Sequence, residues 1–199
     1  MIDRVAGRVL RVGYVPGVTP DKWARAWRER RDGVRLELVQ VEEDDAESAV
    51  RDKRLDMALA RLPVDRTGLH LVRLYDEVPV VVVGREHPVA AYDEIDVAEL
   101  ADEQFVTGPP GGLDLRATQL AFPPMSAKEA VEVVAAGTGI AILPMSVARL
   151  HHRKDVTHRP VRGPASTTIA LIWLTERDDA TTQAFVGVTR GRTARSSRG

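Results

Sequence analysis

Histidine is the residue in this chain best suited to acid–base or metal chemistry, and three of its five copies lie close together. His151 and His152 are adjacent and share a basic stretch with Arg153, Lys154 and His158. Adjacent side chains on a helix point about 100° apart, whereas two histidines that hold a metal on one helix are normally a full turn apart. We therefore expect a surface loop here rather than a metal site.

Sequence motifs for nucleophilic and phosphate chemistry are missing. The chain contains no cysteine, which excludes disulfides, thiolate metal ligands and a cysteine nucleophile. It has neither a Gly-x-Ser-x-Gly turn for a serine nucleophile nor a Gly-x-x-x-x-Gly-Lys phosphate loop. His87 precedes Pro88 and is expected to be structural rather than catalytic. We accordingly predict no enzyme, no catalytic residue, no metal and no cofactor.

A regular alternation of strands and helices fills the first third of the chain. Strands are expected at residues 9–16, 35–41 and 55–62, separated by a helix that starts at Thr19-Pro20 and a helix over residues 44–53. Thr19 suits the N-cap and Pro20 the first turn. Trp23 and Trp27 share one face of the first helix, which is either a core face, the favoured interpretation, or a dimer patch. Strands joined through helices pair in parallel with right-handed crossovers, which predicts an α/β lobe.

The remaining two thirds show a mixed pattern with more breaks. Ser126 and Glu129 form a capping-box pattern at the start of a helix. The strongest break is GPPGG at residues 108–112. Further strands are expected at residues 69–74, 78–83, 104–107, 139–143 and 167–174, and further helices at residues 97–101, 126–136, 144–150 and 181–188.

Four stretches of the sequence, taken in order, resemble a known family. They read LRVGYVP at 10–16, LDMALAR at 55–61, EVPVVVVGREHPVA at 77–90 and VVAAGTGIAILPMS at 133–146. Together they resemble the effector-binding domain of LysR-type transcriptional regulators, which has the type 2 periplasmic-binding-protein fold. The resemblance implies an α/β fold of two Rossmann-like lobes joined by crossing strands. Its parts would be an N-terminal extension at 1–8, lobe I at 9–74 and 164–189, lobe II with the hinge strands at 75–163, and a disordered Arg-rich tail at 190–199.

The sequence departs from the family pattern in two places. Only eight residues precede residue 9, where the family carries a helix-turn-helix DNA-binding domain and a linker helix. We therefore expect a domain without the helix-turn-helix, either as a fragment or as a natural protein of that form. The stretch GPPGGLDLRATQLAFPP is rich in proline and glycine where the family has a longer helix and strand, which indicates a shortened second lobe.

Candidate effector contacts in the first lobe lie where strands end. The loop after the first strand contributes to the family's effector pocket, and this implication carries over to Val18, Thr19 and Pro20. The helix N–H groups exposed there favour an acceptor or an anion, although Asp21 would compete with an anion. The alternative for Thr19 is an N-cap alone. Arg61 ends the third strand and is a candidate for gripping a carboxylate in a bidentate fork, with a salt bridge or a plain surface charge as the alternative.

Candidate contacts in the second lobe are Thr107, Gly108, Pro123, Met125 and Ser126. Thr107 and Gly108 end a short strand and would form the opposing wall of a cleft between the lobes. The alternative is that these two residues have only a structural role. The other three approach a helix N-terminus, and Met125 suits an adaptable apolar pocket.

Charge is unevenly distributed along the chain, whose formal net charge is −1. The last ten residues carry Arg190, Arg192, Arg195 and Arg198 and no acid. Without these four, 24 basic and 29 acidic residues leave a charge of −5. An acidic body is a poor surface for phosphate, so the tail is the expected place of any direct contact with nucleic acid.

We predict a non-enzymatic domain that binds a small organic metabolite as effector and controls transcription as a homodimer. The sequence shows neither a signal peptide nor a run of about 18 apolar residues, so we expect the cytoplasm and no membrane partner. DNA would be reached through the absent helix-turn-helix domain, a partner protein or the tail. The alternatives are a stand-alone binding protein that contacts nucleic acid through the tail and, less favoured, an enzyme on the same fold such as a dehydratase or deaminase.

Overall fold

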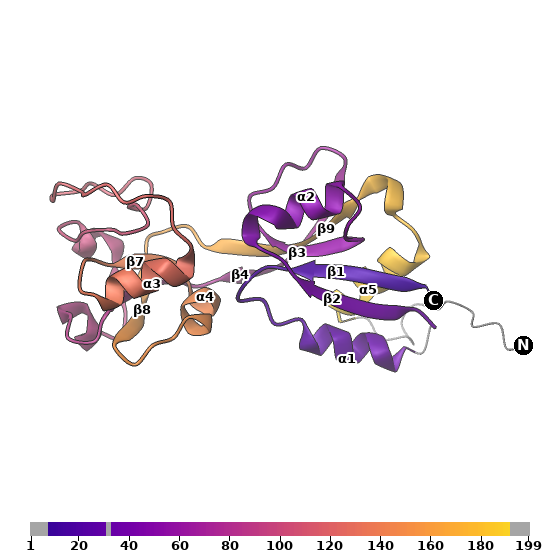
Figure 1. Cartoon of the computed structure of the whole chain (residues 1–199), viewed down its shortest axis with the longest axis horizontal. Coiled ribbons are helices and arrows are strands. Elements are labelled where there is room, and N and C mark those ends of the chain that lie inside the picture. Colours follow the sequence, from indigo (N-terminus) through magenta and orange to yellow (C-terminus); the bar gives the residue numbers. More distant parts are fainter. Residues whose placement is uncertain (1–7, 31–32, 192–199) are drawn as a thin grey trace, which may run out of the picture. The chain divides into compact units, whose positions relative to one another are not determined.

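The computed structural model describes residues 8–30 and 33–191, which form two compact units (Figure 1). Unit 1 combines the described residues up to Tyr75 with those from Thr168 onward, and unit 2 is Asp76–Thr167. The chain enters unit 2 along strand β4 (Leu69–Glu77) and leaves it along strand β9 (Thr167–Leu174). Each unit is built on its own sheet, which confirms the predicted α/β class.

The sheet of unit 1 is mixed and has the strand order β2-β1-β3-β9-β4. Strand β1 pairs in parallel with both β2 and β3, as the alternation of strands and helices predicts, whereas β9 runs antiparallel to β3. The strands are β1 (Val9–Tyr14), β2 (Arg35–Gln40) and β3 (Met57–Arg61). The helical segments are α1 (Asp21–Glu29), η1 (Glu43–Asp45), α2 (Ala46–Arg51), η4 (Thr175–Arg177) and α5 (Ala180–Thr189).

Helix α1 covers the core of unit 1 with its two tryptophans. Trp23 and Trp27 are both buried, which confirms a core face rather than an exposed patch. Trp27 meets Phe185 of α5 edge-on, with ring centroids 5.6 Å apart. The helix starts later than predicted: Pro20, already in helical backbone conformation, is the N-cap, and no side chain caps the helix. The prediction of Thr19 as N-cap is therefore wrong by one residue.

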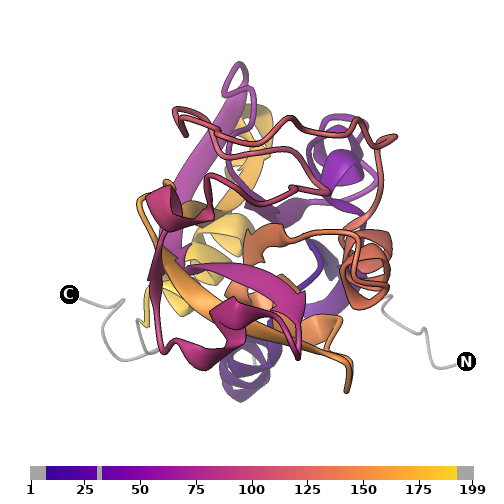
Figure 2. The ribbon, with the colours of Figure 1, turned by 90° about the vertical axis from the view of Figure 1, so that its left-hand side faces the viewer.

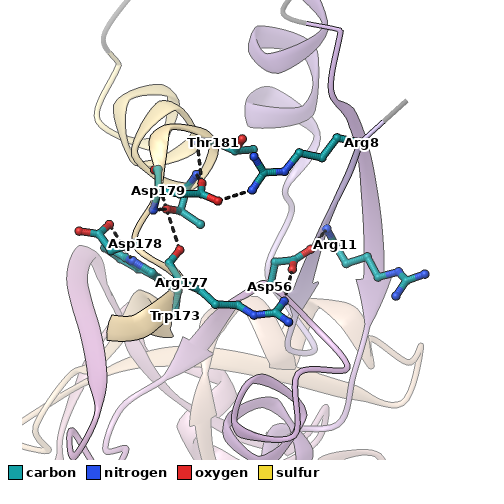
Figure 3. A network of polar contacts seen from close by, with 9 residues as sticks. Arg8, Arg11, Asp56, Trp173, Arg177, Asp178, Asp179 and Thr181 are labelled. Atoms are coloured by element: carbon teal, nitrogen blue, oxygen red, sulfur yellow. Dashed lines mark hydrogen bonds and ion pairs between the residues drawn. The ribbon is translucent and has the colours of Figure 1, made fainter. Parts of the chain in front are cut away.

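A polar network ties the N-terminal edge of unit 1 together (Figure 3). The guanidinium of Arg8 pairs with Asp179, the residue that caps α5. Arg177 donates to Asp56 at 2.8 Å, and the other oxygen of Asp56 accepts the backbone N–H of Arg11 at 2.8 Å. These bonds join the start of β1, the residue before β3 and the start of α5, so we interpret the network as structural.

The sheet of unit 2 has the strand order β6-β8-β5-β7. Its centre, β5, pairs antiparallel with both β7 and β8, and the apolar run of β5 is buried on both faces between two hydrophobic clusters. The strands are β5 (Pro79–Gly84), β6 (Ile95–Asp96), β7 (Ala141–Pro144) and β8 (Val156–Arg162). The helical segments are η2 (Pro88–Ala91), η3 (Val97–Leu100), α3 (Ala127–Ala135) and α4 (Met145–Leu150).

The basic stretch of unit 2 differs from the predicted surface loop. His151 is the C-cap of α4, and His158 lies in the middle of β8, half-buried. The loop prediction holds only for residues 152–155 between these two elements. The pairing of the strands explains the error. Val82 of β5 pairs with His158, and this pairing holds the polar sequence around His158 in a strand.

The strand predicted at residues 104–107 is reduced to a single bridge between Phe105 and Ile140. The N–H of Phe105 donates to the side-chain oxygen of Gln119 at 2.9 Å instead of to a second strand. Residues 101–126 otherwise form a long loop (Figure 2), which ends at the capping box of Ser126 and Glu129. The capping box is confirmed.

Gly139 has no room for a side chain. A Cβ at this position would lie 2.3 Å from the carbonyl oxygen of Gln104. We expect Gly139→Ala to lower the free energy of unfolding by about 1–3 kcal/mol, the usual cost of overpacking. Gly84→Ala is the matched control, because its Cβ would lie no closer than 4.0 Å to another atom, and its effect should stay within about 0.5 kcal/mol. Equal losses of stability for Gly139→Ala and Gly84→Ala in urea unfolding would contradict the close approach of Gly139 to Gln104.

None of the helices in residues 8–30 and 33–191 has both the length and the apolar character needed to span a bilayer.

Candidate functional site

The loop after β1 offers one exposed side chain among its three predicted contacts. Val18 is buried and packs into the core of unit 1, and Pro20 is buried as well. Thr19 is exposed, between Gly17 at φ +88° and the start of α1. At this position its hydroxyl and the first N–H groups of α1 are available to an acceptor.

Arg61 is placed beside this loop and is already engaged. Its side chain is 3% exposed, forms an ion pair with Glu43, and donates to the carbonyl oxygen of Pro16 at 3.1 Å. Glu43 is half exposed at 51%, so this carboxylate screens the arginine from solvent on one side. The arrangement fixes the loop to β3 and η1, and it corresponds to the salt-bridge alternative for Arg61. A ligand carboxylate would have to displace Glu43 to reach the guanidinium.

The predicted contacts of unit 2 come together in one pocket of about 470 Å³. Thr107, Gly108, Pro123 and Met125 all line it, although they come from opposite ends of the long loop. Ser126 follows directly, but its hydroxyl is used by the capping box: it accepts the N–H of Glu129 and donates to the carboxylate of that residue.

The lining of this pocket is free of ionisable side chains. Its twelve residues are aromatic, aliphatic, proline or glycine, with Thr107 and Gln119 as the polar members. Gln119 is held in place, since its amide donates to the carbonyl oxygen of Glu103 at 2.9 Å and accepts the N–H of Phe105. A pocket of this composition suits an apolar or aromatic group with a neutral hydrogen-bonding partner.

Eight of the twelve lining residues of this pocket were not predicted, and Gln119 and Phe122 are the most informative of them. Phe122 is partly buried in the pocket wall. Its residue type was the available signal, because phenylalanine is among the residues most often buried. Gln119 had no signal in the sequence, since its role depends on a contact across the loop.

The histidines of unit 2 show no metal site. Among the described residues, no three His, Cys, Asp or Glu side chains lie close enough together to hold a metal ion. His87 caps η2 by accepting the N–H of Val89 at 3.2 Å, a structural role. The tail arginine Arg190 is the exposed C-cap of α5, whereas Arg192, Arg195 and Arg198 lie outside the described residues.

The half-buried His158 makes stability depend on pH. Burial lowers its pKa below the ordinary value of 6.5, and the charges of Arg149, Arg159 and His152 lower this pKa further. The unfolded chain therefore binds the proton more tightly, and the stability given by neutral His158 is present above pH 6.5 and lost as the pH falls. We expect the free energy of unfolding to decrease between about pH 7.5 and 5.5, and to decrease less in His158→Gln. Identical pH slopes for both proteins would contradict this role.

The sequence matches the family model described as LysR substrate binding domain over residues 4–194. Among curated proteins it is similar to the HTH-type transcriptional regulator AlsR of Bacillus subtilis (strain 168), with 25% identity over 167 residues, 76% of this chain and 55% of AlsR. It is also similar to the HTH-type transcriptional regulator CatR of Pseudomonas putida, with 26% identity over 75% of this chain and 56% of CatR. The chain thus spans about half the length of these relatives.

Solved structures share the fold. A structure described as the BenM effector binding domain with its effector benzoate has a TM-score of 0.73 and 19% identity, over 92% of this chain and 91% of that chain. The reduced form of the OxyR regulatory domain from Pseudomonas aeruginosa has a TM-score of 0.68 and 21% identity, over 92% of this chain and 96% of that chain. The first is described as an effector binding domain and the second as a regulatory domain, and the likeness in fold extends over 92% of this chain in both cases.

Proposed function

This chain belongs to the family of LysR substrate binding domains, and from that premise we propose that it senses a small organic effector for a LysR-type transcriptional regulator. The relatives are described as transcriptional regulators and the structural neighbours as regulatory or effector-binding domains, not as enzymes. Effector binding would favour one of two arrangements of a homodimer in the cytoplasm through its differential affinity for them.

The observation that carries the proposal is the pocket of unit 2 lined by Thr107, Gly108, Pro123 and Met125. We propose that it holds the apolar part of the effector. Its volume of about 470 Å³ lies within the usual range for small-molecule sites. The two phenylalanines in its wall, Phe105 and Phe122, favour an effector with an aromatic or branched aliphatic group. Benzoate is the effector of BenM by its description, and an aromatic acid is one chemistry to screen first.

The loop of unit 1 supplies polar groups of a different kind. We propose that Thr19 and the N–H groups at the start of α1 recognise an acceptor oxygen of an effector. Arg61 acts as a positioning residue in this proposal, because its side chain is bound to Glu43 and Pro16. Val18 and Pro20 shape the loop from its buried side.

We propose DNA binding for the whole regulator and not for the two units described here. We propose that DNA is reached by a helix-turn-helix domain outside this sequence, by a partner protein, or through the arginines of the tail. A salt-dependent shift of DNA by this chain that disappears on deletion of residues 190–199 would favour the tail.

A thermal-shift screen of organic metabolites tests the proposal. A ligand present at 100 times its dissociation constant should raise the free energy of unfolding by about 2.7 kcal/mol. We expect at least one aromatic acid, branched carboxylate or amino acid to raise the melting temperature in proportion to the logarithm of its concentration. No shift with any member of these classes would contradict a working effector site.

A further inference from the structure

A second and larger pocket, of about 740 Å³, lies where strand β5 ends at Gly84. The register places it there: the first residue of β5, Pro79, pairs with Pro144, whereas the last, Gly84, pairs with Val156 and lines the pocket. It shares no lining residue with the pocket around Met125. It is therefore a separate cavity that the proposed effector site does not use.

Three glycines and the C-terminal end of helix α3 form part of the pocket wall. Gly84, Gly137 and Gly139 line it without side chains, and Gly139 must remain glycine because of its approach to Gln104. Helix α3 ends at the pocket, where Val134, Ala135 and Gly137 form part of the wall. The carboxyl end of a helix carries a partial negative charge and attracts cations.

Two of the acidic side chains in the lining are neutralised by partners outside it. Asp102 pairs with Arg116 at 2.7 Å, and Asp155 pairs with Arg153 at 2.8 Å. The remaining charged groups are Arg85, Glu86 and Glu103. Within residues 8–30 and 33–191, the side chains of Arg85 and Glu86 have no ion-pair partner. The pocket thus presents uncompensated charges of both signs.

Glu103 is held in place by His87. Nδ1 of His87 accepts the N–H of Val89, so the ring proton is on Nε2, which lies 3.2 Å from the carboxylate of Glu103 and donates to it. This contact orients the carboxylate of Glu103, and among the described residues no lysine or arginine pairs with it.

We propose that this pocket binds a free amino acid, or a zwitterion of similar size. The ammonium group would lie against Glu103 and the carboxyl end of α3, and the carboxylate would pair with Arg85. Single-charge ligands fit less well, since a plain amine meets the guanidinium of Arg85 and a plain carboxylate meets Glu86 and Glu103. The volume exceeds that of one amino acid, which leaves room for its side chain over Val134 and Ala135.

Amide chemical shifts of the isotope-labelled whole chain test this site. Each common amino acid is titrated in turn, and the best binder is compared with its methyl ester and with the acid that lacks the amino group. We expect saturable shifts at residues 84–87 and 137–139, and at least about tenfold weaker binding when either charge of the ligand is removed, equivalent to ~1.4 kcal/mol. Absence of saturable shifts at these residues with every amino acid would overturn the proposal, and so would equal binding of the ester or the acid.

Two pairs of variants tie binding to the pocket. Glu103→Gln and Arg85→Gln each remove one charge and should each weaken binding about tenfold. The controls Glu99→Gln and Arg66→Gln remove exposed charges outside the pocket lining and should bind as the unchanged chain does. Melting temperatures confirm that all four proteins are folded. If Glu103→Gln and Arg85→Gln both bind with unchanged affinity, the pocket does not recognise the two charges of a zwitterion.

Discussion

Trp27→Ala is expected to lower the free energy of unfolding by about 3–5 kcal/mol, the range for a large aromatic removed from a core. The side chain is 4% exposed, and its ring packs edge-on against Phe185 of α5. Its indole N–H donates to the carbonyl oxygen of Val34 at 2.9 Å. Alanine would remove the ring contact and the hydrogen bond together and leave a cavity between α1 and α5. Urea unfolding followed by circular dichroism measures the loss.

Two further variants separate these contributions. Trp27→Phe keeps an aromatic ring and removes the N–H, so we expect a smaller loss of about 1–3 kcal/mol, the cost of a buried carbonyl that loses its donor. Tyr92→Ala, at a side chain that is 50% exposed, should change the stability by about 0.5 kcal/mol or less. A loss below about 1 kcal/mol for Trp27→Ala would contradict its place at the centre of the core.

Met125→Arg is expected to weaken effector binding at least about a hundredfold, or ~2.7 kcal/mol. Met125 lines a pocket whose other described lining residues are also without charge. An arginine there would fill much of the 470 Å³, and a ligand that enters would have to cover an unpaired guanidinium. Calorimetric titration with the best ligand of the thermal-shift screen measures the change.

Leu150→Arg is the matched control, because Leu150 is 52% exposed and lies outside the pocket lining. It adds the same charge to unit 2 and should leave the affinity unchanged. If Met125→Arg binds as tightly as Leu150→Arg, the effector does not occupy this pocket.

Most of the fold follows from local patterns in the sequence. The alternation of strands and helices predicts the parallel pairing of β1 with β2 and β3, since each connecting helix returns the chain to the end of the sheet at which the previous strand began. The tryptophan face of α1 and the capping box of α3 are also local, and both are confirmed. What local patterns do not show is β8, whose polar residues become a strand only because β5 lies beside them.

The candidate site was harder to predict because side-chain partners lie far apart in the sequence. Arg61 stands at the end of its strand as expected, but its engagement with Glu43 depends on where η1 places that carboxylate. The grouping of Thr107 with Met125 depends on the path of the long loop, which Gln119 fixes through its bonds to Glu103 and Phe105. The strand-end rule selects candidate positions, and only the tertiary contacts show which of their side chains are still available to a ligand.

We propose that a small organic effector binds in the pocket around Thr107 and Met125. The most direct measurement is the pattern of amide chemical shifts in the labelled chain, titrated with the best ligand of the thermal-shift screen. We predict saturable shifts concentrated at residues 105–109 and 119–125, and their loss in Met125→Arg. If a ligand stabilises the protein but causes no amide shift changes at residues 105–109 or 119–125, the effector does not bind in this pocket.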